Sequence, residues 1–292
     1  MILAVDGGGT KTKVIVSDMN GNIVGEATSG PSSIDTVCLT TSIRNIIEAV
    51  STIGEFMFNK VFLGLGGVAS DDDSKSVVDL MSKERGFADA TIICENDVVN
   101  AFFAALKDQQ GMVLIVGTGS VCYGEGKSKH RSGGYGHFEG DPGSAYYLGR
   151  QVIKYIAKTL DDRMRKTDMI QDIMTDHKIN SMTDYIYFIK EMYENRTRTA
   201  ALAKYVTKHA VNKDQHACKI IDDACLELSL MVESVYRHIE SNSNVVYVVG
   251  SLGLEQYFFE QLKKQLRVQG NFELQKSVVE PVYGALFAAG RL

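Results

Sequence analysis

Two segments of the sequence combine glycines, which have a conformationally flexible backbone, with threonine or serine hydroxyl groups. Residues 7–12 read GGGTKT and residues 117–120 read GTGS, and each segment follows a short apolar run. Glycine lets backbone N–H groups approach an anion closely, and consecutive amides form a concave site for phosphate. A plain hairpin turn explains either segment taken singly, but two in the same context favour phosphate binding. The predicted phosphate ligands are Gly8, Gly9, Thr10, Lys11, Thr118, Gly119 and Ser120.

Two aspartates follow expected strands. Asp6 ends the first apolar run beside the first glycine-rich segment, where a single carboxylate suits Mg²⁺, an ion that prefers one or two carboxylates plus water and phosphate oxygens. Asp97 opens an expected helix, whose N-terminus stabilises a carboxylate by about 0.3–1 kcal/mol. It is the candidate base that accepts the proton of an attacking hydroxyl. The simpler alternatives are a turn cap for Asp6 and a helix-start residue for Asp97.

The densest cluster of functional side chains lies in residues 133–144. Five glycines among these twelve residues surround Tyr135, His137, Glu139 and Asp141. Carboxylates that bind neighbouring hydroxyls, beside an aromatic platform, are what recognition of a polyol needs. A long structural loop is the alternative interpretation.

Two other nucleotide-binding motifs are excluded. Residues 64–69 match the G-x-G-x-x-A dinucleotide pattern, but no helix is expected to begin inside them and the acidic residues 71–73 follow at once, as a solvated helix start. Residues 126–128 resemble the end of a Walker A loop, but Val121 stands where that loop requires glycine.

The elements that would position these residues show an internal repeat. Leu3, Val5 and Gly8 have counterparts 111 residues later in Leu114, Val116 and Gly119. Both copies are expected to form a strand, a turn and a returning strand, which indicates two similar α/β domains that face each other across a cleft. Further strands are expected at residues 23–28, 61–65, 90–94 and 245–249. Helices are expected around residues 43–50, 74–85 and 96–106, from near residues 144, 182, 199 and 213, and over 281–289.

Composition excludes several classes of protein. The 292 residues are 45% hydrophobic and 23% charged with a net charge of −5, which disfavours both disorder and sequence-independent nucleic-acid binding. No apolar run is long enough to span a membrane, and the N-terminus lacks the basic start of a signal peptide. Five scattered cysteines without a C-x-x-C pair predict free thiols in a reducing cytoplasm and disfavour a cysteine-bound zinc or iron–sulfur site.

Together, residues 3–12, 95–97, 116–120 and 133–144 resemble the N-acetylglucosamine kinase branch of the BadF/BadG/BcrA/BcrD ATPase family, which has the actin/Hsp70/sugar-kinase fold. The resemblance implies an α/β protein with two ribonuclease-H-like (actin-like ATPase) domains that flank a nucleotide and sugar cleft. The first would comprise residues 1–108 joined by the C-terminal helix 281–292. The second, residues 109–280, would carry the sugar loop and added helices.

The resemblance also implies roles for individual residues. Gly8 to Thr10 and Thr118 to Ser120 would clamp the phosphates of ATP, Asp6 would serve Mg²⁺, and Asp97 would act on a sugar hydroxyl, usually O6. Gly250 and Ser251 match the adenosine segment. The implied sugar-binding residues are Ser33, Asn96, Asp97, Gly134, Tyr135 and Asp141.

Three departures from the family pattern leave the sugar open. Tyr135 stands where tryptophan is usual, Pro142 replaces a glutamate, and Ser33 replaces an asparagine. N-acetylglucosamine, glucosamine, N-acetylmuramate and glucose therefore all stay as candidate substrates, and the resemblance suggests a homodimer. The alternatives are an ATPase that activates another enzyme through cysteine-held iron–sulfur clusters, for which no cysteine here has the context, and a sugar sensor without turnover.

Overall fold

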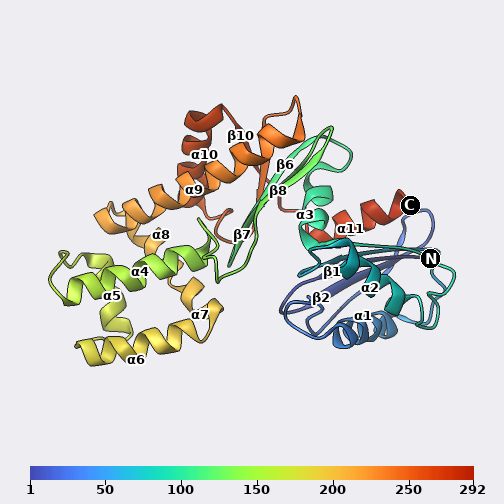
Figure 1. The fold of residues 1–292 in the computed structure, drawn as a ribbon, viewed down its shortest axis with the longest axis horizontal. Coiled ribbons are helices and arrows are strands. Elements are labelled where there is room, and N and C mark those ends of the chain that lie inside the picture. The colour runs from blue at the N-terminus through green and yellow to red at the C-terminus, as the bar shows by residue number, and fades with distance from the viewer. The chain divides into compact units, whose positions relative to one another are not determined.

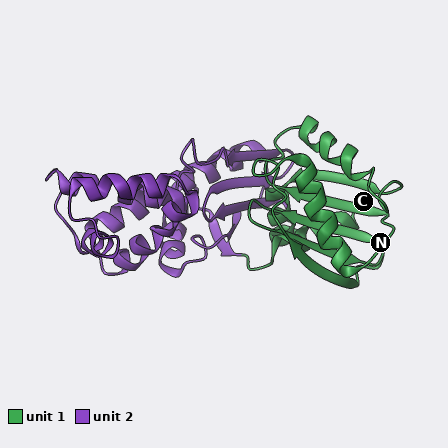
Figure 2. Ribbon diagram, turned by 90° about the horizontal axis from the view of Figure 1, so that it is seen from below, with its two compact units in different colours: residues 1–109, 277–292 green, residues 110–276 purple.

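The computed structural model describes residues 1–292, which form two compact units (Figure 2). The first unit contains Met1–Gln109 and Ser277–Leu292, so the end of the chain returns to the domain in which it begins. The second unit is the intervening segment Gln110–Lys276. Each unit has one five-stranded sheet.

The sheet of the first unit has the strand order β3-β2-β1-β4-β5 (Figure 1). β1 pairs with β2 in antiparallel and with β4 in parallel orientation, and it is buried along nearly its whole length. An Asn-Gly turn at residues 20–21 joins β2 to β3, as the sequence predicts. The strands are β1 (Ile2–Gly7), β2 (Thr12–Ser17), β3 (Ile23–Ser29), β4 (Lys60–Leu65) and β5 (Thr91–Asn96).

Four helices complete the first unit: α1 (Leu39–Ile53), α2 (Asp71–Met81), α3 (Asp97–Leu106) and α11 (Pro281–Gly290). α11 packs on α3 and β1, and glycine makes this contact possible. A Cβ on Gly284 would lie only 2.0 Å from the backbone oxygen of Asn100. The helix that carries Asp97 is therefore held by the C-terminal end of the chain.

The sheet of the second unit repeats the first in strand order, β10-β9-β6-β7-β8. Its central strand β6 pairs with β7 in antiparallel and with β9 in parallel orientation, as β1 does with β2 and β4. This shared topology confirms the α/β repeat predicted from Leu3, Val5 and their counterparts. The strands are β6 (Gly111–Val116), β7 (Ser120–Glu125), β8 (Lys129–Gly133), β9 (Val245–Val249) and β10 (Glu273–Lys276).

The second unit also contains most of the helices. They are α4 (Ala145–Leu160), α5 (Asp168–Asp176), α6 (Met182–Tyr193), α7 (Arg196–Ala201), α8 (Ala203–Val211), α9 (Gln215–Ile239) and α10 (Gln256–Gly270). α9 crosses the sheet and buries the apolar stripe predicted for it, which includes Ile220, Ala224 and Val235. One continuous core connects the sheet to helices α4–α10.

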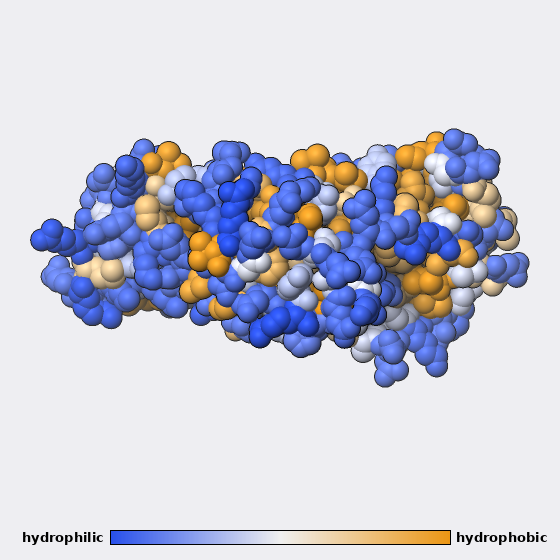
Figure 3. All heavy atoms as spheres, turned by 90° about the horizontal axis from the view of Figure 1, so that it is seen from above, coloured by the Kyte–Doolittle hydropathy of each residue, from blue (hydrophilic) through white to orange (hydrophobic).

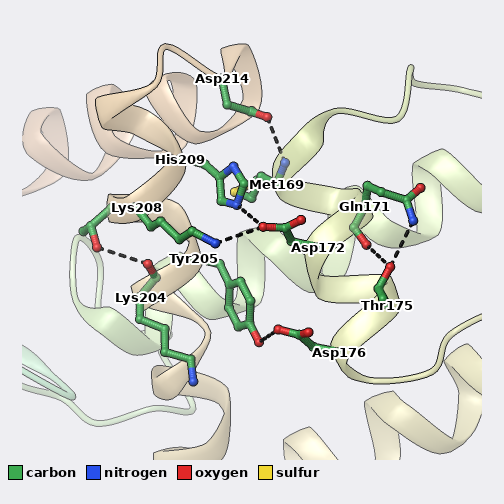
Figure 4. Close-up of polar contacts among 11 residues, drawn as sticks. Met169, Gln171, Asp172, Thr175, Asp176, Lys204, Tyr205, Lys208, His209 and Asp214 are labelled. Carbon is green, nitrogen blue, oxygen red and sulfur yellow. Dashed lines mark hydrogen bonds and ion pairs between the residues drawn. The ribbon is translucent and has the colours of Figure 1, made fainter.

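Polar side chains connect α5 to α8 at the periphery of this helical region (Figure 4). The carboxylate of Asp172 accepts hydrogen bonds from Lys208 Nζ at 3.0 Å and His209 Nε2 at 2.9 Å. Tyr205 OH donates to Asp176 at 2.7 Å. Burial raises the pKa of Tyr205 to about 12, so its hydroxyl stays protonated as the donor. These contacts stabilise helix packing.

Four elements escape the sequence prediction, and two helices differ in extent. α5, α10, β8 and β10 were not expected, and the helix expected over residues 74–85 is α2, which begins and ends earlier. The helix expected from near residue 199 is two helices, α7 and α8, because the hydrogen bonds at Leu202 join residues three positions apart instead of four. Both unexpected strands are edge strands rich in polar residues, so they lack an alternating apolar pattern.

On the face shown in Figure 3, apolar side chains form small separate groups among polar ones. No helix combines the length and the apolar character that crossing a membrane would require.

Candidate active site

The first glycine-rich turn connects β1 to β2, and backbone hydrogen bonds from residues 32 and 33 hold it in place. Gly7 and Thr12 form the last strand pair, and Gly8 N donates to Lys11 O at 3.0 Å. The backbone amides of Ser32 and Ser33 both lie 3.2 Å from Gly8 O. Gly9, Thr10 and Lys11 are exposed at the tip, so their amides and side chains are accessible to a ligand.

Asp6 lies at the end of β1 beside this turn. Its Oδ1 accepts a 2.8 Å hydrogen bond from Nδ2 of Asn100 on α3. Burial raises the pKa of Asp6 above its ordinary value, although the Asn100 hydrogen bond and the charge of Lys11 oppose the rise. The buried Oδ1 of Asn100 has no partner. A half-buried carboxylate held by an amide is a hard oxygen donor that fits Mg²⁺.

Asp97 is the first residue of α3, and Asn96 caps the helix by accepting from Val98 N at 3.2 Å. The carboxylate is half-buried. A Cβ on Gly66 would lie 3.3 Å from Asp97 Oδ2 and 2.6 Å from Ser33 Oγ. The absence of a Cβ at Gly66 therefore lets both side chains lie close to its backbone. Because Asn100 follows Asp97 by three residues, the helix directs both toward the same side.

Ser33 and Asn96 are tied into this region by their own hydrogen bonds. Ser33 is 3% exposed, and its hydroxyl donates to the carboxylate of Asp35. Asn96 uses its oxygen for the helix cap and donates from Nδ2 to Val68 O at 2.8 Å. The structure thus brings Asp6, Ser33 and Asp97 to the same end of the first sheet, where the parallel strands β1, β4 and β5 end.

The second glycine-rich turn connects β6 to β7 and contacts the start of α4. Gly117 N donates to Gly119 O at 2.9 Å, and Gly117 O accepts from Ala145 N at 2.9 Å. Ser120 Oγ donates to Pro142 O at 2.6 Å. The predicted phosphate turn and the predicted sugar loop are therefore joined by hydrogen bonds.

The segment that follows β9 lies against the same turn. Gly253 N donates to Val116 O at 2.9 Å. Gly250 has a φ of +93°, and a Cβ there would lie 2.5 Å from Val116 O, so this position favours glycine. Ser251 is exposed. The structure thus places Gly250 and Ser251 beside the predicted phosphate turn.

Side chains of the loop at residues 134–144 have two different environments. Tyr135 and Phe138 are exposed, by 67% and 92%, and the guanidinium of Arg131 lies 5.8 Å from the ring centroid of Tyr135. Gly134 has a φ of +75° and packs against Val121. Asp141 is only 2% exposed, and its Oδ2 accepts a 2.6 Å hydrogen bond from Arg196 Nη2.

Sequence reasoning missed three residues of these regions: Gly66, Asn100 and Arg196. Gly66 lies in the segment 64–69, whose sequence resembles a dinucleotide motif and gives no sign of a role beside Asp97. Asn100 was recoverable, because it follows Asp97 by three residues on the same helix. No local signal marks Arg196, since its contact with Asp141 joins residues 55 positions apart.

Outside these regions, neither a cavity nor a cluster of metal-binding side chains adds a further predicted site residue. A hollow of about 340 Å³ lies beside the C-terminal half of α1 and the segment that precedes β4, lined by residues that include Val50, Phe56, Phe58 and Phe87, and it contains none of the predicted site residues. No group of three or more histidine, cysteine, aspartate or glutamate side chains forms a ready-made metal site. A metal ion held by Asp6 would need further oxygen ligands from substrate or water.

Two α/β units with the same strand order, each with a glycine-rich turn after its central strand, define the actin-like ATPase fold found in sugar kinases. The chain belongs to the BadF/BadG/BcrA/BcrD ATPase family, whose model matches residues 3–289.

Two relatives extend over almost the whole chain. An N-acetylmuramic acid/N-acetylglucosamine kinase of Clostridium acetobutylicum is 30% identical over 91% of this chain and 90% of its own length. An N-acetyl-D-glucosamine kinase of Dictyostelium discoideum is 26% identical over 99% of this chain and 97% of its own.

Solved structures show the same fold. A Chromobacterium violaceum protein thought to be an N-acetylglucosamine kinase has a TM-score of 0.77 and 19% identity, covering 98% of this chain and 97% of its own. A ROK family glucokinase of Streptomyces griseus, solved with glucose and AMPPNP, has a TM-score of 0.60 and 13% identity, covering 99% and 97%.

Proposed function

We propose that this protein is an ATP-dependent sugar kinase that transfers the γ-phosphoryl group to a hydroxyl, O6, of N-acetylglucosamine or N-acetylmuramate. The observation that carries the proposal is the half-buried carboxylate of Asp97 at the N-terminus of α3, which lies with Ser33 against the backbone of Gly66 at the end of the sheet that also carries Asp6. Membership of the family and the relatives that phosphorylate amino sugars support the same reaction.

In this proposal both glycine-rich turns bind the phosphates of ATP. The proposed donors are in residues 8–11 and 118–120, of which Gly9, Thr10, Lys11 and Thr118 are exposed. Ser120 is 3% exposed and its hydroxyl donates to Pro142 O, so it would offer only its backbone amide. Gly250 and Ser251 are proposed to contact the adenosine. Asp6 holds Mg²⁺, and Asn100 orients its carboxylate. When bound, the ion neutralises charge on the phosphate oxygens.

Asp97 is the proposed general base. It accepts the proton of the sugar hydroxyl while that oxygen forms a bond to the γ-phosphorus and the bond to the leaving ADP breaks. Phosphoryl transfer depends more on positioning and charge neutralisation than on a strong base. A carboxylate at a helix N-terminus therefore suffices.

The sugar is proposed to contact Ser33, Gly134, Tyr135 and Asp141, with Asn96 supporting Asp97 as its helix cap. Tyr135 offers an exposed aromatic face. Oδ2 of Asp141 is occupied by Arg196, so a sugar hydroxyl would have to use Oδ1. Ser33 and Tyr135, which depart from the family pattern, are the positions that would decide between acetylated amino sugars and glucosamine or glucose.

The proposal also includes a cytoplasmic location and a homodimeric assembly. All five cysteines are free, which agrees with a reducing cytoplasm. A homodimer is proposed from the family resemblance, and light scattering of the purified chain tests it.

The test of the function is ADP release from ATP and Mg²⁺ with a panel of sugars. The panel contains N-acetylglucosamine, N-acetylmuramate, glucosamine and glucose, with a sugar-free control. Release that depends on an amino sugar, together with a phosphorylated product whose position is found by NMR, is the expected result. Release that is independent of sugar would instead indicate an ATPase, and sugar binding without release would indicate a sensor.

A further inference from the structure

Arg196 is placed directly against the second glycine-rich turn. Its Nη2 donates to Asp141 Oδ2 at 2.6 Å. A Cβ on Gly119 would lie 2.4 Å from that same Nη2 and 3.0 Å from Asp141 Oδ1. The guanidinium thus lies against the turn at a point where only a glycine leaves room for it.

Tight helix packing fixes the position of Arg196. A Cβ on Gly149 of α4 would lie 1.9 Å from the backbone oxygen of Thr199, so α4 and α7 meet at backbone distance. The buried hydroxyl of Thr199 donates to Met192 O at 2.7 Å, and the side chain of Asn195 caps the start of α7. The close packing of α7 on α4 therefore fixes the position of Arg196 beside the turn.

The pair carries unfavourable features that stability alone does not explain. Nε of Arg196 is buried without a hydrogen-bond partner, which is a costly state for a charged group. Asp141 has a φ of +44°, a backbone conformation that non-glycine residues rarely adopt. Strained backbone conformations and unpaired polar groups of this kind are concentrated at sites where a side chain is positioned to bind a ligand.

Charge indicates the kind of ligand. The first turn contains Lys11, whereas residues 117–120 contain no cationic side chain. Arg196 supplies the missing cation from another segment, and its side chain is 38% exposed despite the bond to Asp141. A guanidinium has five N–H donors in a planar fork that matches phosphate oxygens.

We propose that Arg196 binds the β- or γ-phosphate of the nucleotide held by the second turn, and that Asp141 positions its guanidinium. This inference rests on the proposed function, since it assigns the ligand of the same turn. The negatively charged carboxylate of an acidic sugar is the competing partner, because it offers the same oxygen geometry. The contact with Gly119 of the phosphate turn favours the nucleotide.

Calorimetric binding of ATP, ADP and AMP to the full chain tests the proposal. Arg196→Gln is compared with Arg198→Gln, which removes an exposed arginine two residues away that pairs with Glu191 at 2.6 Å. Loss of one charge-assisted hydrogen bond predicts that Arg196→Gln binds ATP roughly 10- to 100-fold more weakly. AMP affinity should not change, Arg198→Gln should match the parent, and Arg196→Lys should be intermediate.

Three outcomes overturn the inference and leave the proposed function standing. Equal ATP affinity of parent and Arg196→Gln, with sugar-stimulated ADP release intact, rejects the phosphate contact alone. Equal losses for ATP and AMP with a lowered melting temperature indicate a purely structural pair. A loss confined to N-acetylmuramate binding assigns the guanidinium to the sugar carboxylate. A parent protein that fails to bind ATP would overturn the proposed function as well, so the two failures are distinguishable.

Discussion

The two units share one strand order but present different chemistry at the end of their central strands. In the first unit, Asp6 is the last residue but one of β1, and α3 adds Asp97 and Asn100. In the second, the position 111 residues later is Gly117, and the charged groups at the turn, Asp141 and Arg196, come from a loop and a distant helix. Under the proposed function, the same scaffold would hold the base and the metal ligand in one copy, whereas the other copy would contribute to anion recognition only.

The strongest test of this contrast is Asp97→Asn. Loss of a general base predicts a fall in kcat of about 10²- to 10⁴-fold, measured by ADP release with saturating sugar. Nucleotide affinity should survive, because the phosphate turns are unchanged. Glu95→Gln, which neutralises the neighbouring carboxylate, is the matched control and should retain turnover. If Asp97→Asn keeps the turnover of the parent, Asp97 is not the base.

The second test concerns the metal. Asn100→Ala removes the hydrogen bond that orients Asp6, and loss of such a support predicts about 10- to 100-fold weaker metal affinity. The measurement is the Mg²⁺ concentration that gives half-maximal activity. Asp6→Ala should weaken the Mg²⁺ dependence further, since it removes the ligand itself. Identical titration curves for Asp6→Ala and the parent would contradict the assignment.

The third test concerns the glycines that hold the site helices in each unit. Gly284 contacts Asn100 and Ala104 of α3, and Gly149 contacts Thr199 of α7. An added Cβ at either position would meet backbone atoms, so each alanine variant should lose about 1–3 kcal/mol of unfolding free energy in urea. Gly290→Ala is the control, because a Cβ there meets nothing within 4 Å. Unchanged midpoints for both variants would show that the helices shift at no cost.

Comparing the activities of Gly149→Ala and Gly284→Ala tests whether the two units have different roles. Displacement of α7 should lower ATP affinity through Arg196, whereas Gly284→Ala should act first on Asp97 and the Mg²⁺ dependence. Equal effects of both variants on both measurements would contradict a division of chemistry between the units.

The smallest expected effect concerns cysteine reactivity. Hydrogen bonds from Thr40 and Thr41 lower the pKa of the exposed Cys38 thiol to about 7, whereas burial raises the pKa of Cys122 and Cys225. The thiolate is the reactive form, so the iodoacetamide rate at Cys38 should rise from pH 6 to 8 with its midpoint about 7. Peptide mass spectrometry checks the site, with Cys38→Ser as control. Earlier modification of Cys122 or Cys225 would contradict this.

Local patterns predicted much of the scaffold. The strand Val245–Val249 and the start of the helix at Asp97 were predicted at their observed positions, since a continuous apolar run and an asparagine cap are signals within a few residues. The edge strands β8 and β10 were not, because their residues are mostly polar and pairing with a neighbour makes them strands. Helix α10 was overlooked although Phe258, Leu262 and Leu266 recur at helical spacing.

The candidate site divides in the same way. The amino-acid sequence alone specified which turns carry glycine and hydroxyl groups, and which aspartates follow strands, because these are properties of adjacent residues. Only the tertiary structure decided that Asn100 orients Asp6 and that Arg196 reaches Asp141 beside Gly119. Such contacts join segments far apart in the chain, and they exist only once helix packing, such as that of Gly149 on Thr199, brings those segments to backbone distance.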